Sequence, residues 1–269
     1  MQPRYEHHAA IRQNKLSPFF LRVGNSLRNT ECNWHKNIEI LFIKNGNGHI
    51  RYGTYDYSLA KEDLVVVNSG KIHRIYSDDG IDYDCVIIDE QFCKENGLDT
   101  SQAYFEELFR NDATQNLFVR LAEQLRKSTE NAPPYEVAKN RVFAMELLID
   151  LFEWHTIPDN ARPRIEGQTD DSIKKALLFM SENYTRPITL DEIAKAVGLS
   201  KFHLEREFKK YTAQTMFTYL NSLRCKHAEI CIQNGMTVTE AALENGFETL
   251  SYFSRTYKRL MGRSPSRIT

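Results

Sequence analysis

A motif that occurs twice in the last third of the chain constrains the fold more than any other sequence feature. Each copy opens with Thr-x-x-Glu, at residues 189–192 and 237–240. This pattern is a capping box, in which the two side chains satisfy backbone groups at the start of a helix. A glycine follows in each copy, Gly198 and Gly246, and after it comes an amphipathic segment with Arg and Lys. Because glycine permits a sharp turn between helices, the repeat predicts two helix-turn-helix units.

The second helix of each unit is predicted to bury one face and to leave another free for DNA. Leu204, Phe208 and Tyr211 recur at the i, i+4, i+7 spacing of a core face. Arg206 and Arg255 stand at equivalent points of the other face, and a planar guanidinium can bond to guanine O6 and N7 or to phosphate. We therefore expect double-stranded DNA as a partner. The residues expected to contact it are Lys201, Phe202, Glu205, Arg206, Lys209, Leu250, Ser251, Arg255 and Lys258.

The segment between the two units is predicted to set their separation. Residues 216–233 contain neither Gly nor Pro, and as a helix they would span about 27 Å. Such a rod would place the recognition helices about 34 Å apart, one turn of DNA, on one face of a duplex. Lys209 and Lys258 lie a turn beyond the first base-reading positions, so we expect them to contact phosphates. Phe202 can alternatively belong to the core.

The charge distribution favours two domains of different function. Residues 170–269 carry 15 Lys and Arg against 11 Asp and Glu, a net charge of +4, whereas the whole chain has a net charge of −1. A basic C-terminal part suits a module that binds a polyanion. Neither a signal peptide nor an apolar run of the ~18 residues needed to span a membrane is visible. We therefore expect a cytoplasmic protein that does not bind membranes, with its five cysteines reduced.

The N-terminal part has the pattern of strands followed by helices. Short β-rich runs occur at 19–23, 38–43, 64–67 and 85–88, and the Gly- and Asp-rich segments 44–48 and 77–80 indicate turns, so a small antiparallel barrel or sandwich is expected. From residue 101 the period becomes helical, with a short helix predicted around 105–109 and further helices around 117–125 and 137–155. The last has an apolar stripe of Ala138, Val142, Met145, Ile149 and Phe152, widened by Leu147, Leu148, Leu151 and Trp154. Such a helix is expected to pack on its own barrel and on a second chain, although a wholly intramolecular core helix is the alternative.

Residues 246–258, followed by Gly-Arg-Ser-Pro at 262–265, resemble the signature of the AraC/XylS family of bacterial transcription regulators. Residues 193–210 are similar to the first helix-turn-helix of that family. The resemblance implies that both recognition helices dock in successive major-groove segments near promoters, with RNA polymerase as a further partner. The sequence departs from the family pattern at Ala213, where many members have Gly, and at Ile268, near the usual Tyr-Arg.

The strand region resembles the cupin-like effector-binding domain that many members of this family carry. Residues 34–48 are similar to a first cupin motif and residues 68–73 to a second. Metal-binding cupins have a further His where this chain has Asn33. The resemblance implies a pocket that binds a small-molecule effector, a sugar or another hydroxylated compound, by hydrogen bonds, and we expect no metal and no cofactor. The expected effector-binding residues are Arg22, Trp34, His35, Glu39, Tyr52 and His73.

Together these features predict an α+β protein with two domains. Residues 1–95 would form the cupin-like β-barrel, 96–156 a helical dimerisation segment, 157–169 a linker, and 170–269 an all-α domain with two helix-turn-helix motifs. The expected function is that of a homodimeric, effector-controlled transcription regulator, an activator and not an enzyme. The alternative is a cupin metalloenzyme with an auxiliary helical domain, because two imidazoles and a carboxylate can form a non-haem iron site. A third reading, an adaptor that acts through protein contacts alone, does not explain both Arg-bearing copies.

Overall fold

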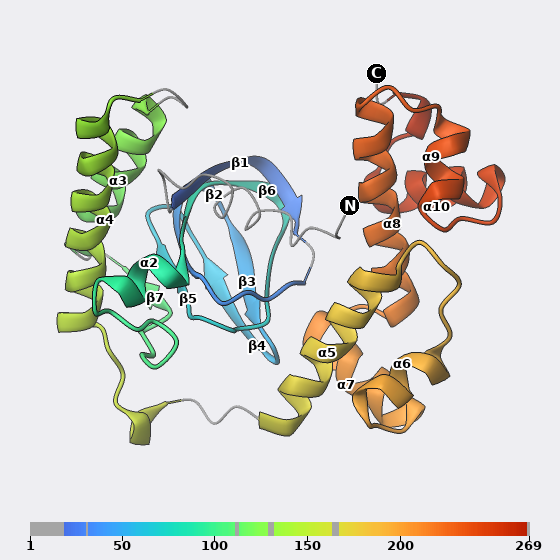
Figure 1. The fold of residues 1–269 in the computed structure, drawn as a ribbon, viewed down its shortest axis with the longest axis horizontal. Coiled ribbons are helices and arrows are strands. Elements are labelled where there is room, and N and C mark those ends of the chain that lie inside the picture. Colours follow the sequence, from blue (N-terminus) through green and yellow to red (C-terminus); the bar gives the residue numbers. More distant parts are fainter. Residues whose placement is uncertain (1–18, 31, 111–112, 129–131, 163–166, 268–269) are drawn as a thin grey trace. The chain divides into compact units, whose positions relative to one another are not determined.

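The computed structural model describes residues 19–30, 32–110, 113–128, 132–162 and 167–267, and the side chains of residues 19–29, 167, 168 and 267 are outside that description. The described residues up to 162 form one compact unit and those from 167 onward form another (Figure 1). Each unit has its own core, so each is described separately. Within the described ranges, none of the helices combines the length and the apolar character needed to cross a bilayer.

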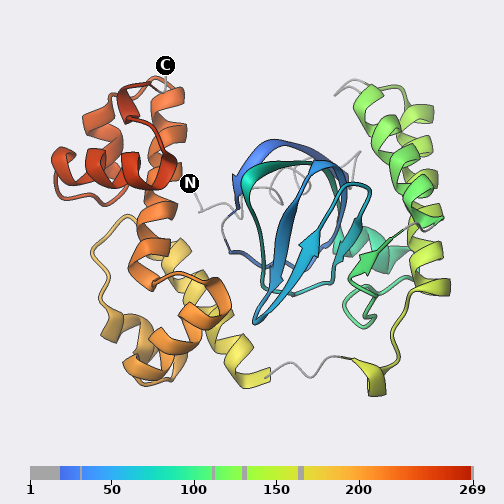
Figure 2. The same cartoon turned by 180° about the vertical axis from the view of Figure 1, so that it is seen from behind.

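The first unit is built on one curled antiparallel sheet (Figure 2). Its strands run in the order β4-β3-β6-β2-β5-β7, and β1 pairs with the other edge of β6. The predicted α+β class with an N-terminal cupin-like sheet is confirmed, with the sheet forming a half-barrel. The strands are β1 (Phe19–Asn29), β2 (Ile38–Gly46), β3 (Gly48–Tyr52), β4 (Tyr55–Leu59), β5 (Leu64–Val67), β6 (His73–Ile88) and β7 (Leu108–Phe109).

Two segments that the sequence marks as turns do not reverse the chain: 77–80 is a bend within β6, and 44–48 contains the junction of β2 and β3. β2 and β3 follow one another along the same edge of β6, so neither 44–48 nor 77–80 reverses the chain. Gly46 has a φ of +82°, and a Cβ placed there would lie 2.6 Å from the carbonyl oxygen of Gly80. Glycine at this point therefore lets two bent strands approach each other, as at the corner of a barrel. The prediction of turns at these positions was wrong.

The two faces of the sheet have different neighbours. On β2, Ile38 and Ile40 belong to the core shared with the helices, whereas Leu41 and Ile43 belong to the core on the inner face. This follows from the alternation of side chains along a strand. The outer face is covered by α2 (Glu90–Glu95), α3 (Thr114–Lys127) and α4 (Pro134–Trp154). Glu39 alternates with Ile38 and Ile40, so the inner face receives its carboxylate.

The predicted short helix around residues 105–109 is instead extended. Leu108 and Phe109 form β7, which pairs with Val65 and Leu64 of β5. Phe105 forms an isolated bridge with Thr156. The i, i+3, i+4 spacing of apolar residues was a misleading signal, because pairing with β5 determines the conformation of so short a segment.

The second unit consists of helices that match the duplicated motif. They are α5 (Gly167–Asn183), α6 (Leu190–Val197), α7 (Lys201–Thr212), α8 (Met216–Gln233), α9 (Val238–Glu244) and α10 (Leu250–Met261). Thr189 and Thr237 form complete capping boxes with Glu192 and Glu240 at the starts of α6 and α9. The pairs α6–α7 and α9–α10 are the two helix-turn-helix units, and α8 joins them as predicted.

The glycines between the paired helices provide a test of this packing. Both have a positive φ, +73° at Gly198 and +82° at Gly246, so a side chain at either position strains the backbone. Only Gly246 is crowded, since a Cβ there would lie 2.6 Å from the carbonyl oxygen of Tyr184. We expect Gly198→Ala to lower the free energy of unfolding by about 1–2 kcal/mol. Gly246→Ala should lower it by a further ~1–3 kcal/mol, the cost of overpacking. Calorimetry of the full chain measures both, and equal losses would contradict the close approach at Gly246.

Candidate DNA interface and effector site

The recognition helices expose every side chain that the sequence assigns to DNA. On α7 these are Lys201, Phe202, Glu205, Arg206 and Lys209, and on α10 they are Leu250, Ser251, Arg255 and Lys258. The opposite faces are buried, with Leu204, Phe208, Phe253 and Tyr257 fully inaccessible. Phe202 is 75% exposed, which removes its alternative role in the core. The structure thus leaves these groups accessible to a duplex, and their contacts with DNA remain a prediction.

The equivalent arginines of the two units differ in their surroundings. Arg206 donates from Nε to Oε1 of Glu207 at 2.9 Å, and its Nη2 lies 2.9 Å from Nδ1 of His203. Because Glu207 is buried, water screens its electrostatic attraction for the guanidinium less strongly. Arg255 makes no hydrogen bond or ion pair with any described residue and is exposed. Arg206 must therefore give up an intramolecular partner to bind DNA, whereas Arg255 need not.

A buried arginine that the sequence analysis missed ties the second unit together. Arg224 of α8 donates from Nε to the carbonyl oxygen of Tyr184 at 2.7 Å and from Nη2 to that of Arg186 at 2.8 Å. Both carbonyls follow α5, at a point where the helical pattern leaves carbonyls without partners. Burial lowers the pKa of Arg224. Arg224 stands among the buried Leu220, Cys225 and Ala228, but in sequence it is not distinguishable from an exposed cation on α8.

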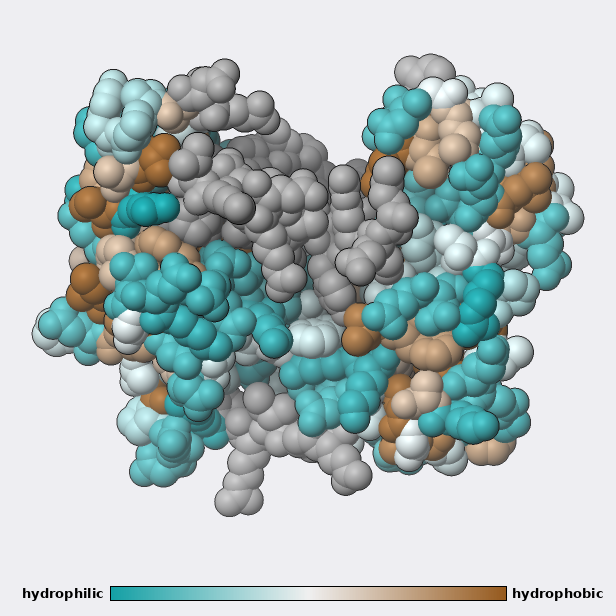
Figure 3. Space-filling view, viewed as in Figure 1, coloured by the Kyte–Doolittle hydropathy of each residue, from teal (hydrophilic) through white to brown (hydrophobic). Residues whose placement is uncertain are grey.

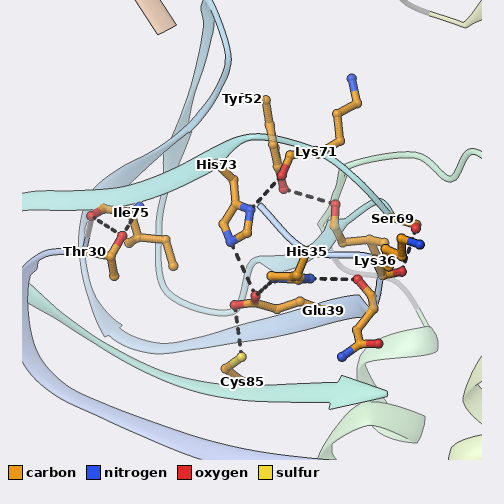
Figure 4. A network of polar contacts seen from close by, with 12 residues as sticks. Thr30, His35, Lys36, Glu39, Tyr52, Ser69, Lys71, His73, Ile75 and Cys85 are labelled. Atoms are coloured by element: carbon orange, nitrogen blue, oxygen red, sulfur yellow. Dashed lines mark hydrogen bonds and ion pairs between the residues drawn. The ribbon is translucent and has the colours of Figure 1, made fainter. Parts of the chain in front are cut away.

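The inner face of the half-barrel contains a cluster of polar side chains centred on Glu39 (Figure 4). Nε2 of His35 lies 2.9 Å from Oε2 of Glu39, and Nε2 of His73 lies 3.4 Å from the same oxygen. Cys85 donates from Sγ to the other oxygen, Oε1, at 3.1 Å. The two imidazole rings meet edge to face with centroids 5.0 Å apart. His35 comes from the loop before β2, Glu39 from β2, and His73 and Cys85 from the two ends of β6.

Local backbone contacts fix the orientation of both imidazoles. Nδ1 of His35 donates to the carbonyl oxygen of Asn37 at 2.9 Å, and Nδ1 of His73 donates to that of Lys71 at 3.0 Å. A carbonyl can only accept, so both rings carry their proton on Nδ1 and present Nε2 to the carboxylate. Burial would raise the pKa of Glu39, but the hydrogen bonds and charges of the two histidines hold it well below its ordinary value. The carboxylate is therefore ionised.

A second polar group lies around a glutamate that the sequence analysis did not identify. Glu107 is buried and accepts from the hydroxyl of Tyr104 at 2.5 Å, and Nζ of Lys71 lies 3.9 Å from it. Burial and then Glu107 raise the pKa of Tyr57 to about 12. Tyr52 belongs to the inner-face core, and its pKa is raised by burial, by Glu107 and by Glu39. Glu107 was missed because its segment was read as a helix.

The remaining predicted effector residues stand apart from the Glu39 cluster or cannot be placed. Tyr52 shares the inner face and donates from its hydroxyl to the carbonyl oxygen of Val66 at 3.0 Å. Trp34 is half-buried in the loop immediately before His35. Arg22 lies on β1, and its side chain is outside the described part. The structure thus brings His35, Glu39 and His73 together, adds Cys85, and leaves the roles of all these residues as predictions.

Two family models match the chain. An AraC-like ligand binding domain matches residues 19–152, and a helix-turn-helix domain matches residues 193–269. The HTH-type transcriptional regulator YbfI of Bacillus subtilis is 26% identical over 230 residues, which cover 81% of this chain and 79% of YbfI. The regulator YdeC of the same organism is 23% identical over 244 residues, which cover 86% of this chain and 83% of YdeC.

A solved structure supports the fold over nearly the whole chain. The crystal structure of an apo ToxT variant from Vibrio cholerae covers 93% of this chain and 96% of its own, with a TM-score of 0.52 and 16% sequence identity. At that identity the similarity concerns the fold alone. It extends through both units, each of which is also matched by its own family model.

The central role of Glu39 in the cluster predicts its effect on stability. Glu39→Ala removes the shared partner of three buried side chains, so the first unit should lose about 3 kcal/mol of stability, the usual cost of breaking a buried pair. Glu62→Ala, at an exposed position on the same unit, should cost less than ~0.5 kcal/mol. Chemical denaturation followed by tryptophan fluorescence, with a chelator present, compares the two variants. Equal stabilities would show that the contacts to Glu39 contribute nothing.

Proposed function

Since the chain belongs to the AraC family of transcription regulators, we propose that α7 and α10 bind successive major-groove segments of promoter DNA in the cytoplasm. We propose also that an effector bound on the inner face of the half-barrel controls this binding. The coarser expectation, a transcription regulator controlled by a small molecule, is confirmed. The alternative of a cupin metalloenzyme is not favoured, because the family and the named relatives are regulators.

The accessibility of Arg255 supports a role for α10 in reading bases. Its guanidinium is exposed and has no intramolecular partner among the described residues, so binding DNA costs it no existing bond. Ser251, one turn earlier, and Lys258, nearly one turn later, are exposed on the same helix. Residues in the first two turns of a recognition helix lie closest to base edges, whereas later cations reach phosphates. We assign base reading to Arg255 and a phosphate contact to Lys258.

Substitution of the two cations separates these roles. Arg255→Ala should weaken binding to the operator by about 1–3 kcal/mol and leave binding to scrambled DNA nearly unchanged. Lys258→Ala should weaken both by a similar factor and reduce the slope of log affinity against log salt by about 1. Fluorescence anisotropy on an operator located by footprinting measures both variants. Equal losses on operator and scrambled DNA for Arg255→Ala would reassign Arg255 to the phosphate backbone.

We further propose that α4 forms a homodimer. Its buried face, with Ala144, Leu147, Leu148 and Leu151, packs on the sheet. A different apolar stripe is exposed or only partly covered, and it includes most of the stripe that the sequence indicates. Brown apolar side chains recur along the edge formed by α3 and α4 in Figure 3. The α4 stripe consists of Tyr135, Ala138, Val142, Met145, Ile149 and Phe152.

The spacing of the α4 stripe supports a helix as its partner. Its residues alternate by three and four positions, which is the a/d pattern of a seam between two helices. Tyr135 is 62% exposed, Val142 54% and Ile149 47%, values unusual for large apolar side chains in a row. A second copy of α4 would bury them, and the predicted helical dimerisation segment would then be centred on this helix.

A charge placed in the stripe tests the dimer. Ile149→Lys should shift the protein toward monomer by at least ~10-fold in dissociation constant, because a buried ammonium costs more than 1.4 kcal/mol. Tyr55→Lys makes the same change of charge at an exposed apolar position on β4, away from α4, and should leave the dimer intact. Sedimentation equilibrium of both variants measures the constants. A monomeric unsubstituted protein, or equal effects of the two changes, would refute this role of α4.

We also propose that the effector is a sugar or another hydroxylated compound and that its binding activates transcription through RNA polymerase. The support is the density of hydrogen-bonding groups on the inner face, where Glu39, His35 and His73 lie beside buried tyrosines. An effector controls DNA affinity only if it binds the two functional states with different free energies. Operator affinity measured against a panel of polyols and sugars tests the class. A response confined to apolar compounds would exclude it while leaving the regulator function intact.

A further inference from the structure

The three side chains at the centre of the Glu39 cluster have the spacing of metal ligands. Oε2 of Glu39 lies 2.9 Å from Nε2 of His35 and 3.4 Å from Nε2 of His73. The three donor atoms all lie within 4.8 Å of one another. Nitrogen and oxygen ligands about 2.1 Å from a tetrahedral ion lie roughly 3.4 Å apart, and those of an octahedral ion somewhat closer. The two separations from Glu39 therefore match those between ligands of one ion.

The hydrogen-bonding pattern around the cluster favours a cation at its centre. Nδ1 of His35 and Nδ1 of His73 both donate to backbone carbonyls, so each ring turns its Nε2 atom toward Glu39. The ionised carboxylate can only accept. Two Nε2 atoms and a carboxylate oxygen thus converge inside a buried site, where their attraction for a positive charge is weakly screened. Either an additional proton on each ring or one divalent cation satisfies all three groups.

The surroundings of the cluster are those of an oriented ligand set. Histidine ligands of metals generally donate their other ring nitrogen to a carbonyl or carboxylate, which fixes the ring. Both histidines do so here, and the S–H group of Cys85 donates to Oε1 of Glu39, which directs Oε2 at the rings. His35 and His73 are 7% and 4% exposed and Glu39 is 8% exposed, so the set is largely shielded from water.

We propose that His35, Glu39 and His73 bind one divalent transition-metal ion on the inner face of the half-barrel. Two imidazole nitrogens and one carboxylate oxygen suit Zn²⁺, Fe²⁺, Co²⁺ and Ni²⁺ and are a poor set for Ca²⁺ or Mg²⁺, which prefer oxygen. Cys85 acts as a hydrogen-bond donor to Glu39 and not as a ligand. The inference is independent of the DNA-binding function, because it concerns the first unit alone and makes no assumption about the effector.

The test begins with the full-length protein stripped of metal by a chelator. Titration with Zn²⁺ in a calorimeter and with Co²⁺ in a spectrophotometer should each give one ion per chain. The Co²⁺ complex should show ligand-field bands without the charge-transfer band of a cobalt–thiolate bond. Failure of the unsubstituted protein to bind either ion at a single site would overturn the proposal. A thiolate band would overturn the assignment of the ligands.

Matched variants assign the ion to this cluster. Glu39→Gln and His73→Asn should each weaken Zn²⁺ binding by more than ~100-fold, since loss of an outer-shell partner alone costs 10–100-fold. His49→Gln removes a histidine of the same sheet, on β3, that stacks on Tyr76 outside the cluster, and it should bind Zn²⁺ as the unsubstituted protein does. Circular dichroism establishes that each variant is folded. Equal affinities of all folded variants, or loss only in His49→Gln, would place the metal elsewhere and refute the site.

Discussion

The buried carboxylate of Glu39 is the interaction on which the interior of the first unit depends. A charged group at 8% exposure is tolerated only if surrounding groups compensate for the water it has lost. Here the compensation comes from three side chains that are far apart in sequence, His35, His73 and Cys85. Because they come from the loop before β2 and from both ends of the bent β6, the carboxylate holds the curled sheet in register. The same arrangement makes the inner face polar at its centre and apolar around it.

In the second unit the corresponding constraint is a close approach of backbones and not a charge. The carbonyl oxygen of Tyr184 accepts from Arg224 and also lies where a Cβ of Gly246 would be. One oxygen after α5 therefore contacts both α8 and the turn between α9 and α10. This junction determines how the second helix-turn-helix unit is attached to the helix that carries the first. It is also why an arginine is found on a buried face of α8, where apolar residues would otherwise be expected.

Much of this fold could be predicted from sequence, and the errors have physical causes. The capping boxes at Thr189 and Thr237 and the uninterrupted helix at 216–233 were predictable because their signals are local. The bends at 44–48 and 77–80 were misread because glycine and aspartate favour turns and sharply bent strands alike, and only pairing with β6 distinguishes the two. The segment at 105–109 was misread because it pairs with β5, a contact that no local pattern contains.

The residues of the candidate sites also differ in whether the sequence alone reveals them. His35, Glu39 and His73 could be found because a family resemblance points to them, but their common contact depends on the strand register. Cys85 could have been found from that register, since it alternates with Val86 on β6 and so faces the interior. Glu107 and Arg224 had no comparable signal. Glu107 contacts Tyr104 in its own segment and Lys71 far away in sequence, and Arg224 contacts backbone carbonyls after α5. Single residues of that kind are indistinguishable in sequence from exposed charges.

The duplication of the helix-turn-helix motif conserves the shape of the two units but not their electrostatics. Arg206 is bound to the buried Glu207, which also lies 3.8 Å from Nζ of Lys210. In the proposed binding mode, a contact between Arg206 and DNA would replace this charge-assisted bond, so its net contribution would be smaller than that of a similar contact by Arg255. The second unit would then supply more of the binding free energy than the first, although the two recognition helices expose equivalent arginines.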